Sequence, residues 1–271
     1  MNKITRAALT PARAFVRWRG KYPWHDRRLK LIRGRSVPEM RRLERELSQE
    51  MLLKLGEPVT ADVVTIIPTY RRPELVVKAV TSALRQDVDR HAVIVLDDAG
   101  GLGDLPVDER LTALSLPRNV GAAGVVRNIG MHLSRSRVVA FLDDDNTWDD
   151  NHLASALPPL QRGADLVYTG FRRVFSDGTV MDELNHPFNR RIMARLSFVD
   201  TSAIVANRHP DLHFSRLKRR PGDGPGEDWE LVFRFSRRHT VEHVPVVTVN
   251  YRVDSDPYFS EWRSHLGGRT E

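Results

Sequence analysis

Short apolar segments alternate with amphipathic ones along most of the chain, and this alternation predicts its secondary structure. Three segments are β-branched or apolar throughout, as expected for parallel strands buried on both faces: residues 63–67, 93–96 and 138–142. Between them, apolar side chains recur at helical spacing over residues 73–85 and 122–133, and a weaker strand is expected at 111–116. This βαβαβ order predicts an α/β domain with a largely parallel sheet.

The pattern continues after residue 150 with a less regular order of elements. We expect a hairpin that turns at Asp177 and Gly178, because an Asp-Gly pair suits a tight turn. The remaining expected elements are helices over 151–160 and 227–238 and strands over 203–206 and 244–252.

Residues 36–56 have the features of an amphipathic helix. Ser36 and Glu39 have capping-box spacing, and Gly56 can end the helix. Its apolar positions share one face: Met40, Leu43, Leu47, Met51, Leu52 and Leu55. We expect this face to pack against the body or a second subunit, as in a homodimer. The competing hypothesis is an interfacial helix at an anionic membrane.

Charge separates this N-terminal extension from the body. Residues 1–60 contain 15 Lys and Arg against 6 Asp and Glu, whereas the rest contains 27 against 29. The absence of Cys excludes disulfide scaffolds and Cys-ligated metal sites. No apolar run approaches the roughly 18 residues of a membrane span. We therefore expect a cytoplasmic protein, with peripheral attachment to the inner face of the membrane as an option. The body shows no nucleic-acid-binding module, so we expect no nucleic acid partner.

Polar side chains follow the ends of the predicted strands, where ligands bind in open α/β sheets. The three groups are Pro68-Thr69-Tyr70, Asp97-Asp98 and Asp143-Asp144-Asp145. Adjacent carboxylates repel one another unless a cation lies among them. Asp143 and Asp145 point to the same side and could hold Mg²⁺ or Mn²⁺. The alternative is a solvated acidic loop.

Two further stretches offer candidate chemistry. Residues 118–130 are rich in Gly and Ala and open a helix whose N–H groups could face a phosphate. Glu227 and Asp228 follow a loop rich in Gly and Pro, at a helix N-terminus, where an ionised carboxylate could act as general base. The alternatives are close helix packing for the first stretch and helix capping for the second.

These motifs together resemble family 2 of the glycosyltransferases, over about residues 62–252. The matching segments are 64–70, 95–98, 119–121, 127–130, 141–146 and 227–229, in the family's order. The resemblance implies the GT-A fold, a Rossmann-like, mostly parallel sheet with helices on both faces, here preceded by an N-terminal helical extension. It also implies an inverting enzyme that needs Mn²⁺ or Mg²⁺ and moves a sugar from a nucleotide-sugar to an acceptor hydroxyl.

The resemblance implies roles for individual residues. Asp145 and Asp143 would bind the metal, and Asp228, with Glu227 beside it, would be the general base. The nucleotide-sugar would contact Pro68, Thr69, Tyr70, Asp97, Asp98, Arg127, Asp143 and Asp144.

We also expect the chain to be organised into three parts, the first of which lies outside the resemblance. These are an extension (1–60), a nucleotide-sugar-binding half (61–150) and an acceptor-binding half (151–271). The donor would be a UDP-, GDP- or dTDP-sugar, and the acceptor a glycan, a lipid-linked molecule or a small molecule. The Q-x-x-R-W signature of polymerising members is absent after Asp228, so we expect a single hexosyl transfer. Asn146 stands where many members carry a further Asp.

Two other functions remain open. A sugar-phosphate nucleotidyltransferase shares the carboxylate and metal layout, but it should carry a Gly-rich loop after the first strand, and residues 68–73 contain no Gly. A non-catalytic nucleotide-sugar-binding protein would not need its acidic residues intact.

Overall fold

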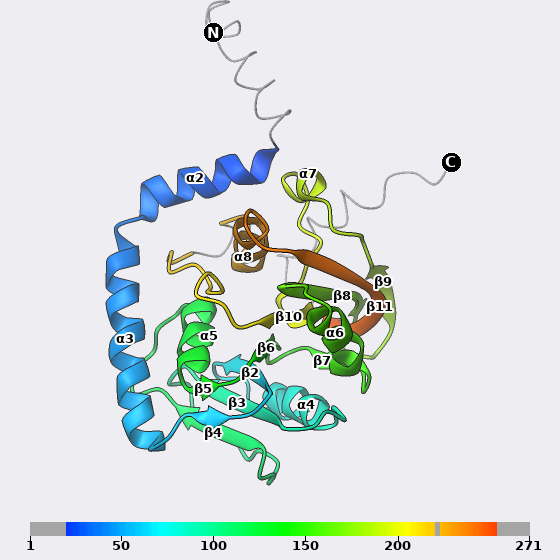
Figure 1. Cartoon of the computed structure of the whole chain (residues 1–271). Helices are drawn as coiled ribbons and strands as arrows, with labels where there is room; N and C mark the ends of the chain where they lie inside the picture. Colours follow the sequence, from blue (N-terminus) through cyan, green and yellow to red (C-terminus); the bar gives the residue numbers. More distant parts are fainter. Residues whose placement is uncertain (1–19, 220–222, 254–271) are drawn as a thin grey trace, which may run out of the picture.

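The computed structural model describes residues 20–219 and 223–253, and its centre is a curled nine-stranded sheet (Figure 1). The strand order is β4-β3-β2-β6-β10-β8-β11-β7, with β9 paired to β8. The strands are β2 (Val63–Thr69), β3 (His91–Asp97), β4 (Leu111–Ser115), β6 (Val138–Phe141), β7 (Thr147–Trp148), β8 (Leu166–Val174), β9 (Val180–Leu184), β10 (Ile204–Asn207) and β11 (Val241–Arg252). A separate pair joins β1 (Val59–Thr60) to β5 (Ser134–Arg135).

Half of the sheet is parallel, as the sequence predicts. β4, β3, β2 and β6 run in the same direction, and β2 and β3 are buried along their whole length. β10 then runs antiparallel to both β6 and β8, so the sheet is mixed beyond β6. Thr69 pairs with Asp97 and Asp97 with Ser115, so the carboxyl ends of these strands meet at one edge.

Helices cover both faces of the sheet (Figure 1). α4 (Pro73–Leu84) and α6 (His152–Gln161) lie on the same face. The side-chain amide of Gln86, just after α4, links them, because it donates to Asp149 O and accepts from Leu153 N. α5 (Ala123–His132) covers the other face. The remaining helices are α7 (Arg190–Met193), α8 (Glu227–Phe235) and the 3₁₀ turn η1 (Thr201–Ala203). The α/β expectation is confirmed.

The described part of the N-terminal extension, from residue 20 on, contains the helices α2 (Lys21–Arg33) and α3 (Ser36–Leu55), of which the sequence predicted only α3. The apolar face of α3 packs on α5, and Met40, Leu47 and Met51 are buried. The expectation that this face packs against the body is therefore confirmed.

A buried ionic group reinforces this packing. Glu44, on α3, accepts hydrogen bonds from Asn128 on α5 and from Arg216 in the segment after β10. Burial alone would raise the pKa of Glu44, but hydrogen bonds from His132, Arg216 and Asn128 lower it to about 2. An unpaired charge there would be costly, so these bonds fix where α3 docks.

The predicted capping box is wrong, because α3 begins almost where α2 ends. Arg35 is the N-cap residue and no side chain caps the helix. The Ser36 hydroxyl instead donates to Arg33 O at 2.8 Å and accepts from Lys218 N at 3.2 Å. The backbone between the two helices accepts a hydrogen bond from the first turn of α3, since Val37 N donates to Gly34 O at 3.1 Å.

Replacing Leu47 with alanine is expected to destabilise the protein by about 2–5 kcal/mol, because the residue is fully buried between α3 and the body. Leu53 lies on the same helix and is 85% exposed, so Leu53→Ala should leave stability within about 0.5 kcal/mol of the parent. Urea unfolding of the two variants measures the difference. Equal stability would mean that α3 does not dock on α5.

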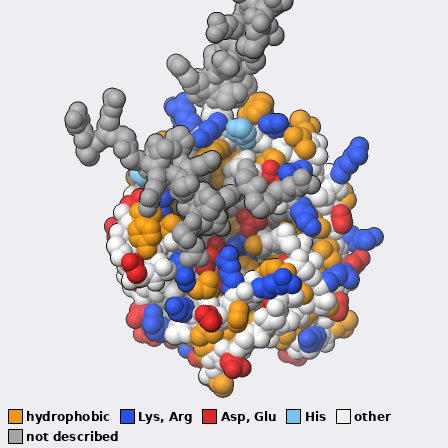
Figure 2. Space-filling view, turned by 180° about the vertical axis from the view of Figure 1, so that it is seen from behind, with side chains coloured by type: hydrophobic (Ala, Val, Ile, Leu, Met, Phe, Trp, Pro, Cys, Tyr) orange, Lys and Arg blue, Asp and Glu red, His pale blue; other side chains and the backbone are white. Residues whose placement is uncertain are grey.

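Within the described ranges, no helix has the length and apolar character required to cross a membrane. Figure 2 shows Lys and Arg side chains spread over one face of the molecule, with acidic and apolar ones between them. The visible part of this face has no continuous basic surface.

Candidate active site

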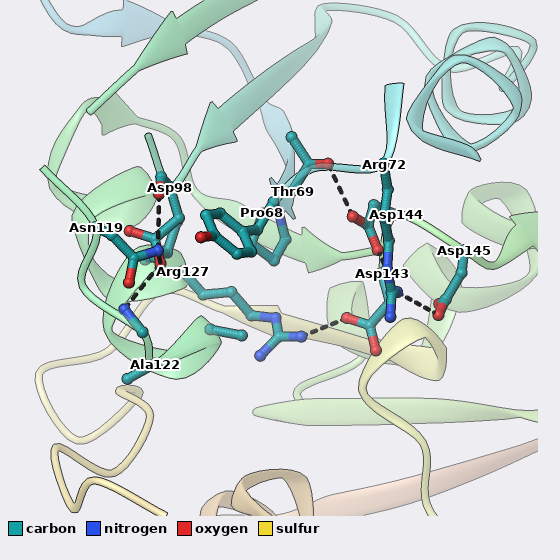
Figure 3. A pocket seen from close by; sticks show the side chains of 14 residues that line it. Pro68, Thr69, Arg72, Asp98, Asn119, Ala122, Arg127, Asp143, Asp144 and Asp145 are labelled. Atoms are coloured by element: carbon teal, nitrogen blue, oxygen red, sulfur yellow. Dashed lines mark hydrogen bonds and ion pairs between the residues drawn. The ribbon is translucent and has the colours of Figure 1, made fainter. Parts of the chain in front are cut away.

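A pocket of about 400 Å³ opens at the carboxyl ends of β2, β3 and β6 (Figure 3). It contains seven of the eight predicted nucleotide-sugar contacts, all except Asp97. Its lining comprises Pro68, Thr69, Tyr70, Arg72, Asp98, Asn119, Gly121, Ala122, Ala123, Val126, Arg127, Asp143, Asp144 and Asp145.

One end of this pocket is organised by Asp98. Its carboxylate accepts hydrogen bonds from Val120 N at 2.6 Å, Gly121 N at 2.9 Å and the Asn119 amide at 3.0 Å. Burial raises the pKa of Asp98, and the two backbone bonds oppose that shift. These bonds hold the loop before α5 against the end of β3, and Tyr70 lies half-exposed nearby on the pocket wall.

Asp97 does not line the pocket. Its carboxylate accepts from Gly100 N at 2.8 Å and Gly101 N at 2.9 Å, and the residue is fully buried. It therefore shapes the turn after β3. Because Asp97 and Asp98 are adjacent in the sequence, the sequence alone could not show which of them shapes the turn and which lines the pocket.

The opposite end of the pocket holds the acidic triplet (Figure 3). Asp144 accepts from the Thr69 hydroxyl at 2.8 Å and from Arg72 at 3.1 Å. The same Arg72 nitrogen donates to Asp145 at 2.7 Å. The third carboxylate, Asp143, pairs with Arg127. Two arginines, Arg72 and Arg127, therefore bind all three acids. The spacing of residues along the sequence did not predict these ion pairs.

The triplet still carries excess negative charge. Burial, followed by the charges of Asp143 and Asp144, raises the pKa of Asp145 to about 6, although Arg72 opposes the shift. Burial likewise raises the pKa of Asp144. Hard carboxylate oxygens that repel one another at the wall of an open pocket fit a divalent cation such as Mn²⁺ or Mg²⁺. Asp144 is buried and the side chains of Asp143 and Asp145 are 26% and 27% exposed, which favours a cation site over a solvated loop.

Arg127 links the two halves of the site. It is almost fully buried on α5, and its guanidinium pairs with Asp143 after β6 and with Glu227 at the start of α8. The guanidinium also lies 5.0 Å from the centre of the Phe214 ring. Among the described residues, its Nε–H has no hydrogen-bond partner. A buried donor without a partner is costly, and a bound acceptor group could satisfy it.

The two predicted catalytic acids at the start of α8 have different surroundings. Glu227 is occupied by Arg127 and by Gly124 N, which donates at 3.1 Å. Asp228 accepts from Trp229 N at 2.6 Å and lines a second cavity. Burial raises the pKa of Asp228 to about 6, with further upward contributions from Glu227 and Asp143. This favours Asp228 over Glu227 as the base.

Sequence reasoning missed Asp200, a buried carboxylate close to these acids. It accepts from Ser202 N at 2.8 Å and caps η1. Burial, then the charges of Asp143 and Asp228, raises its pKa well above the usual value.

Ser202 and Asn146 support the loop that carries the acidic triplet. The Ser202 hydroxyl accepts from Asp143 N at 3.2 Å and from the Asn146 amide at 2.8 Å. Asn146 is buried and its carbonyl oxygen accepts from Arg252 N at 3.0 Å. Both ends of its amide therefore make structural hydrogen bonds, which explains why an Asn is suitable at position 146, where many family members carry Asp.

Curated relatives are glycosyltransferases and polysaccharide biosynthesis proteins. The putative teichuronic acid biosynthesis glycosyltransferase TuaG of Bacillus subtilis (strain 168) is 32% identical over 129 residues, 45% of this chain and 51% of the relative. The succinoglycan biosynthesis protein ExoO of Rhizobium meliloti (strain 1021) is 27% identical over 161 residues, 55% of this chain and 44% of the relative. The chain thus spans about half the length of these relatives.

Solved structures of GT-A glycosyltransferases share the fold. S. aureus TarS in complex with UDP-GlcNAc matches with a TM-score of 0.56 and 18% identity, over 73% of this chain and 60% of that one. The mannosyltransferase PcManGT from Pyrobaculum calidifontis, in complex with GDP-Man and Mn²⁺, matches with a TM-score of 0.52 and 17% identity, over 87% and 71%. Residues 64–215, more than half of the chain, match the profile of Glycosyl transferase family 2. The chain belongs to glycosyl transferase family 2.

Proposed function

We propose that this glycosyltransferase moves one sugar from a nucleotide-sugar to an acceptor hydroxyl, with inversion at the anomeric carbon and with a divalent metal. The observation that carries the proposal is the arrangement of two adjacent cavities. The donor-sized pocket ends at Asp143, and the second cavity contains Asp228. A donor and an acceptor could therefore approach each other from opposite sides of this acidic centre.

The donor pocket offers complementary groups for each part of a nucleotide-sugar. Tyr70 presents a ring and Asp98 a carboxylate at one end, where the base would bind. Arg127 lines the pocket between these groups and the acidic triplet (Figure 3), where the ribose or diphosphate would lie. Pro68 and Thr69 form the floor from the end of β2.

Asp143 and Asp145 are the residues that would hold Mn²⁺ or Mg²⁺. When bound, this ion supplies positive charge to the leaving diphosphate. Asp144 is bonded to Thr69 and Arg72 and keeps the loop in place. Arg72 and Arg127 add positive charge near the same point, which favours the departure of an anionic leaving group.

Asp228 would act as the general base. Its free carboxylate oxygen would take the proton of the acceptor hydroxyl as the hydroxyl oxygen bonds to the anomeric carbon. The bond between that carbon and the diphosphate breaks at the same time, which releases a nucleoside diphosphate. Attack from the side opposite the leaving group inverts the anomeric configuration. A pKa near 6 suits a base that works near neutral pH.

The proposal includes the class of donor, the class of acceptor and the part of the chain that binds each of them. Structures that share this fold hold UDP-GlcNAc or GDP-Man, so we include UDP- and GDP-sugars among the donors, together with dTDP-sugars. The curated relatives are named for polysaccharide biosynthesis, which favours a glycan or its lipid-linked precursor as acceptor. Residues 61–150 would bind the donor and residues 151–271 the acceptor.

The membrane, the homodimer and the cytoplasmic location stay predictions. The buried face of α3 is unavailable for a membrane or a second subunit. The large apolar side chains that remain exposed on α2 are Trp24, Leu31 and Ile32, close in sequence to Arg27 and Arg28. We propose that the extension would attach to a membrane or to a second subunit through this face of α2.

A panel of UDP-, GDP- and dTDP-sugars with Mn²⁺ tests the proposed activity. We expect one donor class to release nucleoside diphosphate, faster with a hydroxyl acceptor than with water, and to stop in EDTA. Release of pyrophosphate from a nucleoside triphosphate and a sugar 1-phosphate would instead identify a nucleotidyltransferase. Tight donor binding without any release would identify a non-catalytic binding protein.

A further inference from the structure

The cavity that contains Asp228 is small and has several aromatic residues in its lining. Its volume is about 190 Å³, below the range of sites for drug-sized ligands. Its rings are Tyr22, Phe171, Phe198 and Tyr251, and its acids are Asp200 and Asp228. Arg173 also reaches it, but this guanidinium is paired with Asp182. The cavity therefore combines flat apolar walls with carboxylates that can accept hydrogen bonds.

One wall of this cavity comes from the N-terminal extension. Tyr22 lies on α2, outside the segment 64–215 that matches the family. Its ring stands edge-on to Trp229 with ring centres 5.7 Å apart, and its N–H donates to Ala194 O at 3.2 Å. Gly20 precedes it with φ +91°, and a side chain there would collide with the backbone of Ala194. This close approach places the start of α2 at the rim of the cavity.

Ion pairs also connect α2 to α8, the helix that carries Asp228, and the two helices lie near each other in Figure 1. Lys30 bonds the buried carboxylate of Glu230 on α8 at 3.1 Å and that of Asp26 at 2.8 Å. Asp26 in turn pairs with Arg219 at 3.2 Å. Asp26, Glu230 and Arg219 are largely shielded from solvent, whereas the Lys30 side chain is 46% exposed, and together these ion pairs hold α2 in position relative to the base.

We infer that α2 completes the acceptor site, and that this site takes a single sugar ring with Tyr22 as a residue that selects it. The inference rests on the proposed glycosyl transfer. The C–H face of a pyranose packs on aromatic rings, and its hydroxyls donate hydrogen bonds to carboxylates. One such hydroxyl would then lie at Asp228. Residues outside the family match would thus help to set the acceptor specificity of the enzyme.

The charges favour a sugar ring over a phosphate group. The cavity contains Asp200 and Asp228, and Arg173 is neutralised by Asp182. An anionic lipid phosphate placed between these carboxylates would be repelled. In a lipid-linked acceptor, we therefore expect the sugar and not the phosphate to occupy the cavity.

Binding of methyl glycosides tests the inference without any donor. Methyl α- and β-glycosides of glucose, galactose and mannose are titrated into the full chain and followed by saturation-transfer NMR. We expect at least one to bind, and Tyr22→Ala to weaken its binding by about five- to tenfold, the loss of one aromatic contact. Tyr22→Phe keeps the ring and should restore binding. Leu31→Ala, on the same helix and 87% exposed, is the matched control.

Three measurements make the outcome decisive. Tyr22→Leu keeps apolar packing on Trp229, so it should fold even if Tyr22→Ala does not, and should bind glycosides as weakly. Unchanged binding in both variants, or binding of a soluble prenyl phosphate with no glycoside bound, overturns the inference. UDP and GDP binding with Mg²⁺ is measured separately. Glycoside binding that depends on Tyr22 without any nucleotide binding would reject the proposed transfer and leave the sugar site standing.

Discussion

Replacing Asp145 with alanine is expected to abolish transfer and to weaken nucleoside diphosphate binding in Mn²⁺, while changing binding little in EDTA. The reason is that Asp145 and the diphosphate would share one cation. Removal of a single charge-stabilising group lowers rates by about 10²–10³, and loss of a metal ligand should cost at least that. Isothermal titration with UDP or GDP in the two conditions, beside the rate of transfer, measures the effect.

The structure indicates that this variant will fold. Arg72 keeps Asp144 as a partner when Asp145 is removed, and Asp144 also keeps its bond to Thr69. Asp150→Ala is the matched control, because Asp150 lies five positions along the chain with a side chain 72% exposed, paired with Arg85. If Asp145→Ala weakened binding equally in Mn²⁺ and EDTA, the triplet would be a structural element only.

The parts of the fold that could be predicted are those in which burial determines the type of residue at successive positions. β2 and β3 are buried along their length, so most of their residues are apolar. The apolar face of α3 was visible for the same reason. α2 was not predicted, because only Asp26 is buried on this helix and its docking rests on ion pairs such as Lys30 with Glu230. Partners 200 positions apart leave no local pattern.

The candidate site divides in the same way. Residues that end a buried strand were found, since strand order alone brings Asp98 and Asp143 to one edge. Arg72, Asp200 and Tyr22 were missed, because each reaches the site through tertiary packing. Asp97 and Asp98 are neighbours in sequence, yet one shapes a turn and the other lines the pocket. Only side-chain direction separates these two roles.

Asp228→Asn should behave differently from Asp145→Ala, because a base acts on the acceptor. Asparagine is nearly isosteric, and its side-chain oxygen can still accept the Trp229 N–H, so the fold and the affinity for nucleoside diphosphate should be retained. The chemical step should slow by roughly 10²–10⁴, the value of general-base assistance. Stopped assays at saturating donor and acceptor measure this step. A fully active variant would transfer the role to Glu227, since Glu230 is buried and bonded to Lys30 and Arg234.

The pH dependence of the parent enzyme provides a second readout of the same group. Burial raises the pKa of Asp228 to about 6, and only the ionised form can accept a proton. The rate of transfer should therefore fall as the pH drops through about 6 and level off above it. Saturating Mn²⁺ and donor keep the ionisation of Asp145, whose pKa is also about 6, from limiting the rate. The residual activity of Asp228→Asn should lack this acid limb. If that limb persisted in the variant, the titrating group would lie elsewhere in the acidic centre and Asp228 would not be the base.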